Sequence, residues 1–584
     1  MTTNFSSDWP MANTQHGLLV AFGEFLQQHG LIERLRQMPI PQKTRTFAPQ
    51  TKLVEFLAGI MSGIEHLEDL NDGSHPLVKD QVVAQAWGQP GFAHYSGVSR
   101  TLDACDTNTV TAVEQAIQAF SQPFIRTTIQ GLLRRGEAIT YDFDLTGQAV
   151  SPTSTTYAGA AFGWMNDGVK LGYQLARVCL SPAGEDRLWL AGFHHPGDTV
   201  SANCLKDLVR AAEAQTQVRP RRRTELVQQR LAAQGDLVAR TRRLVKQQHT
   251  KLRHLQQKQT ELIGKCYHAT QQRKGALSRK KQAVLKAQLI RWKKRLPRLE
   301  AQLLKCQQVL TKHQAHLQEH TQALTELQVW LTQLEADHRT NPDPPAYVEA
   351  RMDAGFVSGE NLTWLLEMGY CPNTKAPNDR TTMALRKRLS RQTRWVRVGE
   401  NAEMTAWGNY VMHGCPYPLT VALERFKVKR TYHYATLIHY RDDGFFPTLP
   451  VWFQHYNERQ TIEAGNKEMK GTFFVQHLMS RSPAGIRLQV LFTGLVANAV
   501  RWCIPWLKNC APEPTPKFVR TLNSPKHLVQ DAANAAARVQ QTHCGTALQF
   551  APESPFPGLT LFLKGVPAFQ LAFGFNQPLK IESG

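Results

Sequence analysis

The chain has 584 residues, enough for roughly three or four domains, and 42% of them are apolar, which excludes a disordered or fibrous protein. Its net charge of +22 and pI near 9.6 favour a polyanion over a small neutral substrate, with nucleic acid as the first candidate and anionic membranes or acidic proteins as alternatives. The sequence has no run of about 20 apolar residues, no secretion signal at its start and no Cys-x-x-Cys pair among its ten cysteines, so we expect a soluble, cytoplasmic protein with reduced cysteines.

Residues 1–130 are predicted to form a domain of short helices. The segment LVEFLAGIMSG places apolar side chains at helical spacing, at Leu53, Phe56, Leu57 and Ile60. Another helix is expected to open near Ser96, after the turn-prone GQPGFAHYS. Such a domain can place Arg100 in a groove of DNA, or it can be a packing domain without DNA contact. The residues alone leave both interpretations open.

From about residue 137 the apolar pattern changes from helical to alternating. The segment AITYDFDL alternates apolar and polar residues, as a half-buried strand does. Two strand-like runs follow, Gly172–Leu180 and Leu188–Phe193, and then a helix that Thr199 or Ser201 is expected to cap. Strand, strand, strand, helix is the order in which a ribonuclease-H-like core begins, although many α/β folds begin in the same way. We therefore expect residues 137–218 to form the first part of an α/β core.

Residues 219–342 have a different periodicity. In the second half of this segment, core-type positions recur at alternating steps of four and three over seven heptads, at Leu285, Leu289, Trp292, Leu296, Leu299, Leu303, Cys306, Leu310, His313, Leu317, His320, Leu324, Leu327, Leu331 and Leu334. This spacing predicts a coiled coil. The preceding arm, residues 222–262, has a looser pattern, and Gly264 and Gly275 bracket a plausible reversal. We expect an antiparallel helical hairpin whose second arm is kinked or loosened at Pro297.

The same segment holds most of the positive charge of the chain. Residues 219–340 contain 27 lysines and arginines against 8 aspartates and glutamates, a net charge of +19 out of +22. A face of that charge suits contact with phosphates. Dimerisation through the arms, or a solvated surface without a partner, are the alternatives.

After the linker-like NPDPP, the chain returns to the α/β pattern. A strand is expected at Tyr347–Asp353, followed by a turn and a helix capped by Ser358, which together make 343–372 the second part of the core. Residues 373–448 contain four strand-like runs and are predicted to be a strand-rich insertion. A long helix is expected from about Pro450 through Trp502, within the final core segment 449–508. Residues 509–584 form a C-terminal region to which the sequence assigns no role.

Three carboxylates stand where a metal-dependent phosphodiester reaction needs them. Two cations about 3.5–4 Å apart are held by roughly three carboxylates from separate elements. Asp144 ends the first strand, and Asp142 lies on the same strand face, so geometry alone does not separate the two. Asp353 closes a later strand, where α/β proteins place functional groups. The third candidate, Glu463, lies in the segment YNERQTIEAGNKEMK.

That last segment carries a motif at fixed spacing. Tyr456, Arg459, Glu463 and Lys470 are separated by three, four and seven residues, which would place all four near one stripe of a single helix. A surface salt-bridge ladder is the ordinary explanation of such a stripe. The spacing Tyr-x2-Arg-x3-Glu-x6-Lys, however, matches the Y-R-E-K motif of a large group of bacterial insertion-sequence transposases. The chain is therefore similar to a DDE transposase of that group.

Further segments support this resemblance, which covers most of residues 50–500. They are DLT at 144–146, DAGFVSGENLTWL at 353–365, LFTGLVANAV at 491–500 and the amino-terminal GIEHLEDL and LVKDQVVAQAWG. The basic coiled-coil segment does not belong to the common pattern of the family. In this family most insertions fall between the second aspartate and the glutamate, and the strand-rich segment lies there. Its Trp395 or Trp407 can stack on a flipped base or can be core residues.

The resemblance implies a function and a set of roles. Asp144, Asp353 and Glu463 would bind two Mg²⁺ or Mn²⁺ ions, and the D-x-T pattern favours Asp144 over Asp142. Arg459 and Lys470 would contact phosphates of the transposon end, and Tyr456 would help to position it. The expected activity is cleavage of the terminal inverted repeats and strand transfer into target DNA, by a homodimer on DNA in the bacterial cytoplasm, associated with the nucleoid.

Two other interpretations remain at this point. A domesticated DNA-binding protein would keep the fold and lose catalysis, with the coiled coil as an interaction arm, and the three intact carboxylates argue against it. A structural coiled-coil protein has only the basic insertion in its favour.

Overall fold

The computed structural model describes residues 11–43, 46–165, 168–341, 347–377, 379–440, 448–532, 535–542 and 545–564. They form two compact units. Unit 1 comprises Met1–Pro220, Pro344–Leu366 and Tyr370–Gly584, and unit 2 comprises Arg221–Asp343 and Glu367–Gly369. Most of the linker-like NPDPP lies outside the described residues. The expected mixed α/β architecture is confirmed, and each unit is described below by itself.

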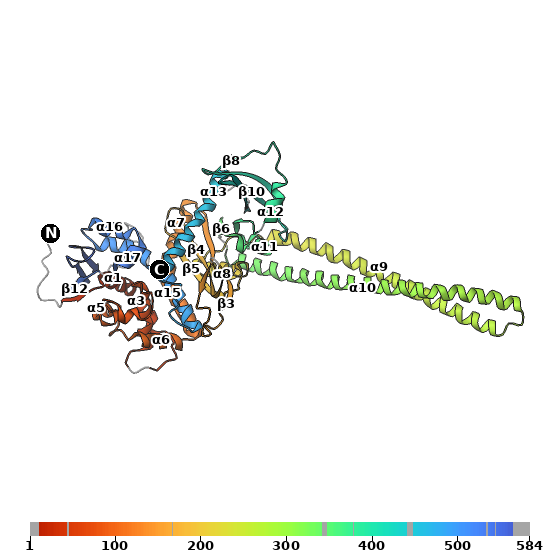
Figure 1. The fold of residues 1–584 in the computed structure, drawn as a ribbon, viewed down its shortest axis with the longest axis horizontal. Helices are drawn as coiled ribbons and strands as arrows, with labels where there is room; N and C mark the ends of the chain where they lie inside the picture. Colours follow the sequence, from red (N-terminus) through yellow and green to blue (C-terminus); the bar gives the residue numbers. More distant parts are fainter. Residues whose placement is uncertain are drawn as a thin grey trace, which may run out of the picture. The chain divides into compact units, whose positions relative to one another are not determined.

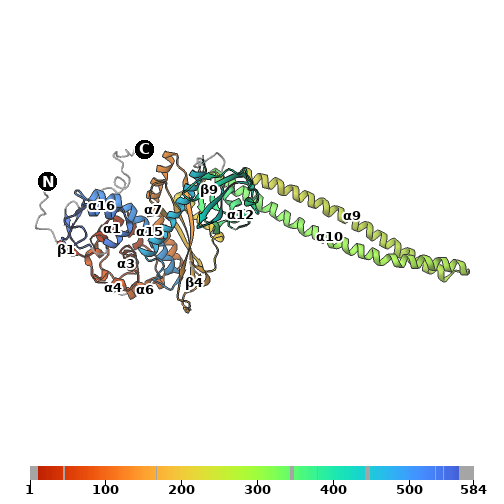
Figure 2. The same cartoon turned by 45° about the horizontal axis from the view of Figure 1, so that its top comes forward.

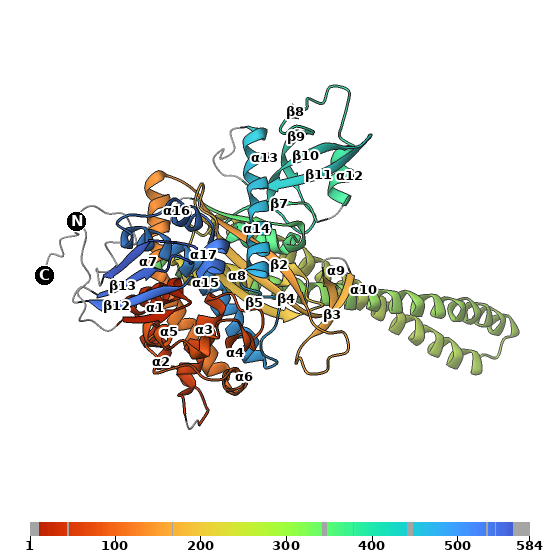
Figure 3. The same cartoon turned by 60° about the vertical axis from the view of Figure 1, so that its left-hand side comes forward.

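The main sheet of unit 1 has ten strands. They are β2 (Ile139–Ala149), β3 (Ala161–Met165), β4 (Gly168–Leu180), β5 (Leu188–Pro196), β6 (Val348–Met352), β7 (Cys371–Lys375), β8 (Val396–Arg397), β9 (Ala402–Val411), β10 (Pro418–Val428) and β11 (Thr431–His439). The order is β3-β4-β2-β6-β7-β11-β10-β9-β8, and β5 also pairs with β4 (Figure 3). Only the two central pairs, β2 with β6 and β6 with β7, are parallel.

Strand β2, the first strand of the main sheet along the chain, is buried on both faces. All of its residues from 139 to 144 are buried, so the expectation of a half-buried strand is wrong. The reason is that helices cover both sides: α8 (Leu205–Thr216) and α14 (Thr461–Gly471) both contact β2. Central strands of a parallel pairing are commonly enclosed in this way. Its polar residues therefore sit in an interior and need partners there.

The sequence predicted capping residues for two helices next to this sheet, α8 and α11. The helix after β5 starts at Leu205, preceded by a 3-10 turn η2 (Ser201–Asn203), and neither Thr199 nor Ser201 caps it. Ser358 does cap α11 (Gly359–Glu367), since its Oγ accepts a hydrogen bond from the backbone N–H of Asn361 at 3.0 Å. A 3-10 turn, η3 (Ala354–Phe356), lies between β6 and that helix.

The amino-terminal part of unit 1 is helical, as expected, apart from one strand. Its helices are α1 (Gly17–Gln28), α2 (Leu31–Arg36), α3 (Pro49–Met61), α4 (Asp69–Asp72), η1 (Leu77–Lys79), α5 (Gln81–Ala86), α6 (Tyr95–Ala104) and α7 (Thr107–Arg135). The four apolar positions predicted for α3 are all buried.

The strand β1 (Met11–Thr14) joins this part to the C-terminal region. It is the edge of a second, antiparallel sheet ordered β1-β12-β13-β14, with β12 (Ala537–Thr542), β13 (Gly545–Phe550) and β14 (Thr560–Lys564) (Figure 3). The N–H of Gly17 donates to the carbonyl of Ala535 at 2.8 Å. Two short helices, α16 (Pro516–Leu522) and α17 (Pro525–Ala532), lead into these strands. The C-terminal region thus completes the amino-terminal part of the unit.

The strand-rich segment continues the main sheet. Strands β8, β10 and β11 correspond to three of the four predicted runs, whereas the run predicted at 410–414 overlaps β9 only at the last two residues of that strand. Strand β11 pairs with the core strand β7. A short helix, α12 (Asp379–Arg386), contacts β10 and β11. Because the pairing is continuous, the segment forms an extension of the core sheet.

The segment after the sheet is interrupted, whereas one long helix was expected. It consists of α13 (Leu449–Asn457), a 3-10 turn η4 (Glu458–Gln460), α14, and then α15 (Pro483–Cys510). Between α14 and α15, Phe474 has a φ of 46°, which a helix does not tolerate. Ser482 caps α15 directly before Pro483, so a new helix begins there.

The long apolar helix α15 contributes many buried side chains to the core of unit 1. It packs along β5 and α7 (Figure 1). By length and composition it could cross a bilayer, but 78% of its most apolar window is buried inside the structure. The apolar side chains of α15 therefore lie largely in the interior of unit 1.

Unit 2 is an antiparallel hairpin of α9 (Thr224–Lys274) and α10 (Arg279–Thr340), which run side by side (Figures 1 and 2). The coiled-coil prediction is confirmed, because all fifteen predicted heptad positions of α10 are buried or half-buried. The reversal falls at residues 275–278, so Gly264 lies within α9. The helix α10 continues through Pro297 without interruption.

Candidate active site

Two of the predicted carboxylates lie close together. In the parallel pair β2 and β6, Asp142 is opposite Arg351. Asp144 lies two residues further along β2, which continues to Ala149, so the expectation that Asp144 ends its strand is wrong; Asp353 directly follows the end of β6 at Met352. Both carboxylates approach the same atom: Nη2 of Arg459 is 3.4 Å from Oδ1 of Asp144 and 3.7 Å from Oδ2 of Asp353. The parallel pairing therefore brings together two residues that are 209 positions apart in the chain.

The structure separates the two strand aspartates, which the sequence left open. Asp142 is fully buried, and its carboxylate accepts hydrogen bonds from Nε of Arg351 at 2.6 Å, Nη2 of Arg187 at 2.7 Å and Oγ of Ser181 at 2.6 Å. Burial alone would raise the pKa of Asp142, but the two arginines outweigh it and lower the pKa. Asp142 is thus committed to an internal ion-pair network, and Asp144 is the candidate site residue.

Asp144 is held by residues from two neighbouring elements. Its Oδ2 accepts a hydrogen bond from Nδ2 of Asn466 at 2.7 Å and lies 3.5 Å from Nη2 of Arg177. The same Nη2 atom donates to the carbonyl of Ile462 at 2.9 Å, so the buried Arg177 on β4 fixes the start of α14 against the sheet. The sequence analysis missed both residues. The signals were an arginine in the apolar strand YQLARVCL and an asparagine three residues after Glu463.

The electrostatics of the pair differ at its two members. Burial raises the pKa of Asp353, the charge of Asp144 adds to that rise, and Arg459 opposes it. Asp353 is also the cap of η3, since its Oδ1 accepts from the N–H of Gly355 at 2.9 Å. Burial lowers the pKa of Lys470, which lies on α14 and interacts with the charge of Asp144. The negative charges of Asp144 and Asp353 therefore lie beside the positive charges of Arg459 and Lys470 in a partly buried site.

Glu463 is placed differently from the two aspartates. It is exposed on the first turn of α14, three residues before Asn466 and seven before Lys470, so these residues share one face of that helix. Because Asn466 contacts Asp144, this face is directed towards the aspartates. Within the described part of the chain, the three carboxylates do not form a group whose ligand atoms all lie within 4.8 Å of one another.

The Y-R-E-K residues do not share one helix, contrary to expectation. Tyr456 lies on α13, Arg459 on η4, and Glu463 and Lys470 on α14, because the 3-10 turn separates the two helices. Tyr456 is buried, and its hydroxyl donates to the carbonyl of Met352 at 3.4 Å, directly before Asp353. Burial raises the pKa of Tyr456 to about 12. In this structure Tyr456 therefore supports the end of β6.

The remaining candidates lie apart from the carboxylates. Arg100 is exposed on α6 and lines a cavity of about 500 Å³ together with Lys43, Phe47, Lys52 and His94. Trp395 and Trp407 are half-buried, so neither is fully enclosed in the core, and base stacking stays a prediction. Trp395 is occupied by a cation–π contact with Arg425, at 4.0 Å from the ring centroid. A more exposed aromatic pair on β3 was missed, Phe162 at 58% and Trp164 at 70% exposure.

The donor set fits a hard divalent cation. Two carboxylates already share one positive group, the Arg459 guanidinium, and carboxylate oxygens are the ligands that Mg²⁺ and Mn²⁺ prefer. Comparison with known proteins adds no family: no family model matches this chain, and no curated protein matches it.

Proposed function

We propose that the chain is a DDE-type DNA transposase, which cleaves transposon ends and joins them to target DNA. The observation that carries the proposal is the convergence of Asp144 and Asp353 on a single cationic atom, just beyond the point where the parallel pairing of β2 and β6 ends. A carboxylate pair at this place suits a divalent cation and a phosphodiester substrate. The spacing of Tyr456, Arg459, Glu463 and Lys470 is the second support.

The order of elements supports a ribonuclease-H-like core. Apart from the short strand β3, which pairs with β4, three antiparallel strands, β2, β4 and β5, precede the helix α8, as such a core begins. The first strand then pairs in parallel with β6, which leads into Asp353, and β6 pairs in parallel with β7. Functional groups of α/β proteins gather at the carboxyl ends of such strands.

Each residue of the site then has a part in the reaction. Asp144 and Asp353 would hold Mg²⁺ or Mn²⁺, with Glu463 completing the set from α14. When bound, such ions activate a water or a 3′-hydroxyl and stabilise the leaving oxygen. Arg177 and Asn466 orient Asp144, while Arg459 and Lys470 offer positive charge to the phosphates. Water as the nucleophile gives a nick, and the freed 3′-hydroxyl gives joining.

The rest of the molecule supplies the DNA contacts in this proposal. The hairpin carries +19 of the net charge, and Arg100 lines a cavity with two lysines. Both suit phosphates. Two DNA ends have to be joined in one event, so we propose that the protein acts as a homodimer on DNA, in the bacterial cytoplasm.

One observation favours the alternative, an inactive DNA-binding protein. The ion pairs of Arg459 with both aspartates place a protein cation between the two carboxylates, and Glu463 is exposed outside the pair. In an active enzyme, Arg459 would move to a DNA phosphate and the face of α14 would close on the aspartates. In a domesticated protein this arrangement would persist on DNA.

A strand-transfer assay distinguishes the two functions. The wild-type protein is incubated with the DNA that flanks its own reading frame, a target plasmid, and Mg²⁺ or a chelator. The proposal expects nicked ends and joined products that require the metal. End binding without any metal-dependent product would establish the inactive DNA-binding protein instead. A matched variant, Glu400→Gln, removes an exposed carboxylate outside the site and should leave the products unchanged.

A further inference from the structure

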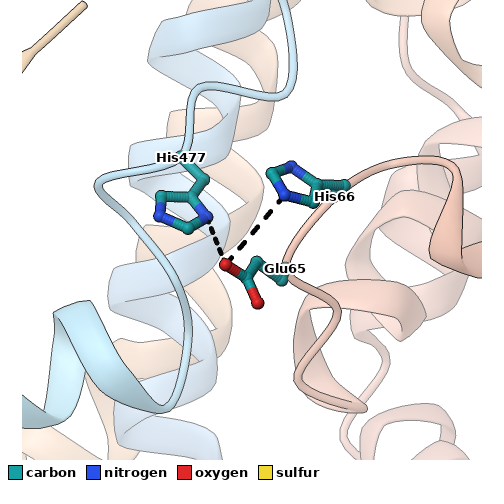
Figure 4. A group of neighbouring side chains, drawn as sticks. All are labelled: Glu65, His66 and His477. Atoms are coloured by element: carbon teal, nitrogen blue, oxygen red, sulfur yellow. Dashed lines mark ion pairs between the residues drawn. The ribbon is translucent and has the colours of Figure 1, made fainter.

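A cluster of metal-ligating side chains lies outside the carboxylate site. Glu65 and His66 follow α3, and His477 lies between α14 and α15, so the cluster joins segments about 410 residues apart in the chain (Figure 4). One ligand atom from each residue lies within 4.8 Å of the other two. Among the residues that the structure describes, this is the one group of three such side chains that meets that distance.

The distances within the cluster suit a shared ion. Nδ1 of His477 is 3.0 Å from Oε1 of Glu65, and Nε2 of His66 is 4.0 Å from the same oxygen. Ligand atoms bound to one Zn²⁺ at about 2.0–2.1 Å are typically separated by similar distances. Although Nδ1 of His477 is close to that oxygen, it is buried and makes no hydrogen bond of good geometry.

Both loops that carry the cluster are held in place by the fold. The N–H groups of Glu65 and His66 donate to Oδ2 of Asp69 at 2.9 and 2.8 Å. On the other side, the carbonyl of His477 accepts a hydrogen bond from Nε2 of the buried Gln489 on α15 at 2.7 Å. The backbones that present the ligands are therefore fixed before any ion arrives, which lowers the cost of binding.

The loops also approach each other closely. Gly63 has a φ of 75°, and a Cβ added there would lie 3.4 Å from the carbonyl oxygen of Thr472. A larger residue would strain this turn, because the left-handed region suits glycine. The glycine thus allows the loop after α3 to lie against the segment that leads to His477.

We propose that Glu65, His66 and His477 form a binding site for a transition-metal ion of the Zn²⁺ type, distinct from the carboxylate site. Two imidazoles and one carboxylate favour Zn²⁺ over Mg²⁺, which prefers oxygen ligands. Water would fill the open position, since the side chains of Glu65 and His66 are 46% and 65% exposed. The bound ion would tie the amino-terminal helices to the segment between α14 and α15.

Binding requires one local movement. The rings of His66 and His477 are stacked, with centroids 5.2 Å apart and an angle of 10° between planes, so their lone pairs do not yet point to one position. His66 is exposed and can turn about its side-chain bonds. The other ring nitrogen of His477 lies 3.3 Å from the amide of Gln476, which can orient the ring as an outer hydrogen-bond partner.

Metal titration of the full-length protein tests this site. The protein is stripped with a chelator, and Zn²⁺ is added by calorimetry in excess Mg²⁺, which occupies oxygen-ligand sites. We expect one bound Zn²⁺ per chain, a rise in the thermal unfolding midpoint, and, with Co²⁺ as the probe, a visible absorption band of nitrogen ligation. Glu65→Gln and His477→Ala should each weaken binding by about tenfold or more.

Two controls make the result specific. His254→Ala removes an exposed histidine of the hairpin and should leave Zn²⁺ binding unchanged. Asp353→Asn should also retain it, so the test does not depend on the proposed transposase activity. Because Glu65 is exposed, Glu65→Gln should fold normally, which its unfolding midpoint without metal checks. The proposal is overturned if the stripped wild type binds no Zn²⁺ at micromolar concentration, or if the cluster variants bind it as tightly as the wild type.

Discussion

At the residue scale, Asp142 and Asp144 are alternate residues of one strand with different roles. The fully buried carboxylate of Asp142 pairs with the buried Arg351 and the half-buried Arg187, so Asp142→Asn removes a charge partner from both arginines. We expect the free energy of unfolding to fall by about 3–5 kcal/mol. Asp144→Asn should cost far less stability and should abolish cleavage. Urea unfolding and cleavage by the folded fraction, measured on both variants, check the assignment.

The pH dependence of stability follows from the same network. The pKa of Asp142 is lower in the folded protein than in the unfolded chain, so the carboxylate stabilises the fold above the unfolded value. That contribution is lost as the pH falls through the folded pKa. The wild type should therefore lose more stability than Asp142→Asn between neutral and strongly acidic pH. Parallel pH profiles of the two proteins would reject the network.

Arg459 is the residue whose role the structure changes most. It pairs with both site carboxylates and so competes with a metal ion for them. We expect Arg459→Gln to bind Mn²⁺ more tightly than the wild type when no DNA is present, and to bind transposon ends more weakly. Electron paramagnetic resonance of free Mn²⁺ and a gel-shift assay measure the two effects. Mn²⁺ affinity that is unchanged or lower would show that Arg459 does not occupy the metal position.

The sequence predicted these residues only in part. The fixed spacing of the motif identified Arg459 and Glu463, and a strand end identified Asp353. It could not show which of two alternate aspartates is paired internally, because Arg351 and Arg187 reach Asp142 through tertiary contacts. Arg177 and Asn466 were missed for the same reason, since each acts through a neighbour on another element.

At the element scale, the charge of the hairpin is concentrated towards its tip. Residues 249–305 contain 16 lysines and arginines against 2 glutamates, a net charge of +14 out of +19 for the segment. Gln248 and Cys306 face each other across the hairpin, because Sγ of Cys306 is 3.8 Å from the carbonyl oxygen of Gln248. A short Gly/Ser linker can therefore replace 249–305 without disturbing the proximal arms.

We expect this truncation to flatten the salt dependence of DNA binding. Removing one phosphate contact lowers the slope of log K against log salt by about 0.9. A full-length variant with Lys280, Lys281, Lys293, Lys294 and Arg295 all changed to Gln separates charge from length, and it should flatten the slope in the same direction. If both proteins keep the wild-type slope, the hairpin tip does not bind DNA.

The apolar seam of the hairpin bears on dimerisation. Leu285, Leu289, Leu303 and Leu310 of α10 are buried within one chain, together with Leu262 of α9. Because these leucines are already buried within the hairpin, they leave little apolar surface for a coiled coil with a second copy of the chain. The truncated protein should therefore keep the wild-type molar mass in sedimentation, after allowance for the deleted residues. A shift to a smaller oligomer would show that the arms also hold two chains together.

Helices and strands could be predicted from the sequence where one hydrophobic period persists along the whole element. The heptads of α10 span the whole arm, and the period of 3.5 fixes the buried face regardless of tertiary context. The break between α13 and α14 was not predictable, because Glu458, Arg459 and Gln460 are all good helix formers. In the structure the side chain of Glu458 lies 3.5 Å from Nη1 of Arg351, an interaction that no local pattern contains.

At the scale of the whole molecule, strand pairing links the amino-terminal and carboxyl-terminal parts of unit 1. The edge strand β1 pairs with β12, more than 500 residues later in the chain. Sequence patterns do not reveal such pairing, and residues 509–584 had no assigned role for that reason. The continuation of the core sheet through β11 and β10 was hidden in the same way, since strands were predicted without their partners.

The pairing of β1 with the C-terminal strands predicts a long-range effect of a single substitution. Leu548 of β13 is fully buried, so Leu548→Ala should cost about 2–5 kcal/mol of stability. It should also speed hydrogen exchange at the N–H of Gly17, whose acceptor is the carbonyl of Ala535. Gln549→Ala, at an exposed neighbour, is the matched control and should change neither. Exchange at Gly17 that does not respond to Leu548→Ala would separate the two ends.

The central claim is that Asp144, Asp353 and Glu463 hold the metal for DNA cleavage. It is tested most directly by single-turnover cleavage of a labelled transposon end with Mg²⁺, measured alongside end binding for Asp144→Asn, Asp353→Asn and Glu463→Gln. Each change removes the charge of a ligand and little volume, so each variant should lose cleavage by about 100-fold or more and bind ends nearly as well as the wild type. Cleavage at the wild-type rate by any of the three would contradict the account for that residue, and wild-type rates in Asp144→Asn and Asp353→Asn would refute the site.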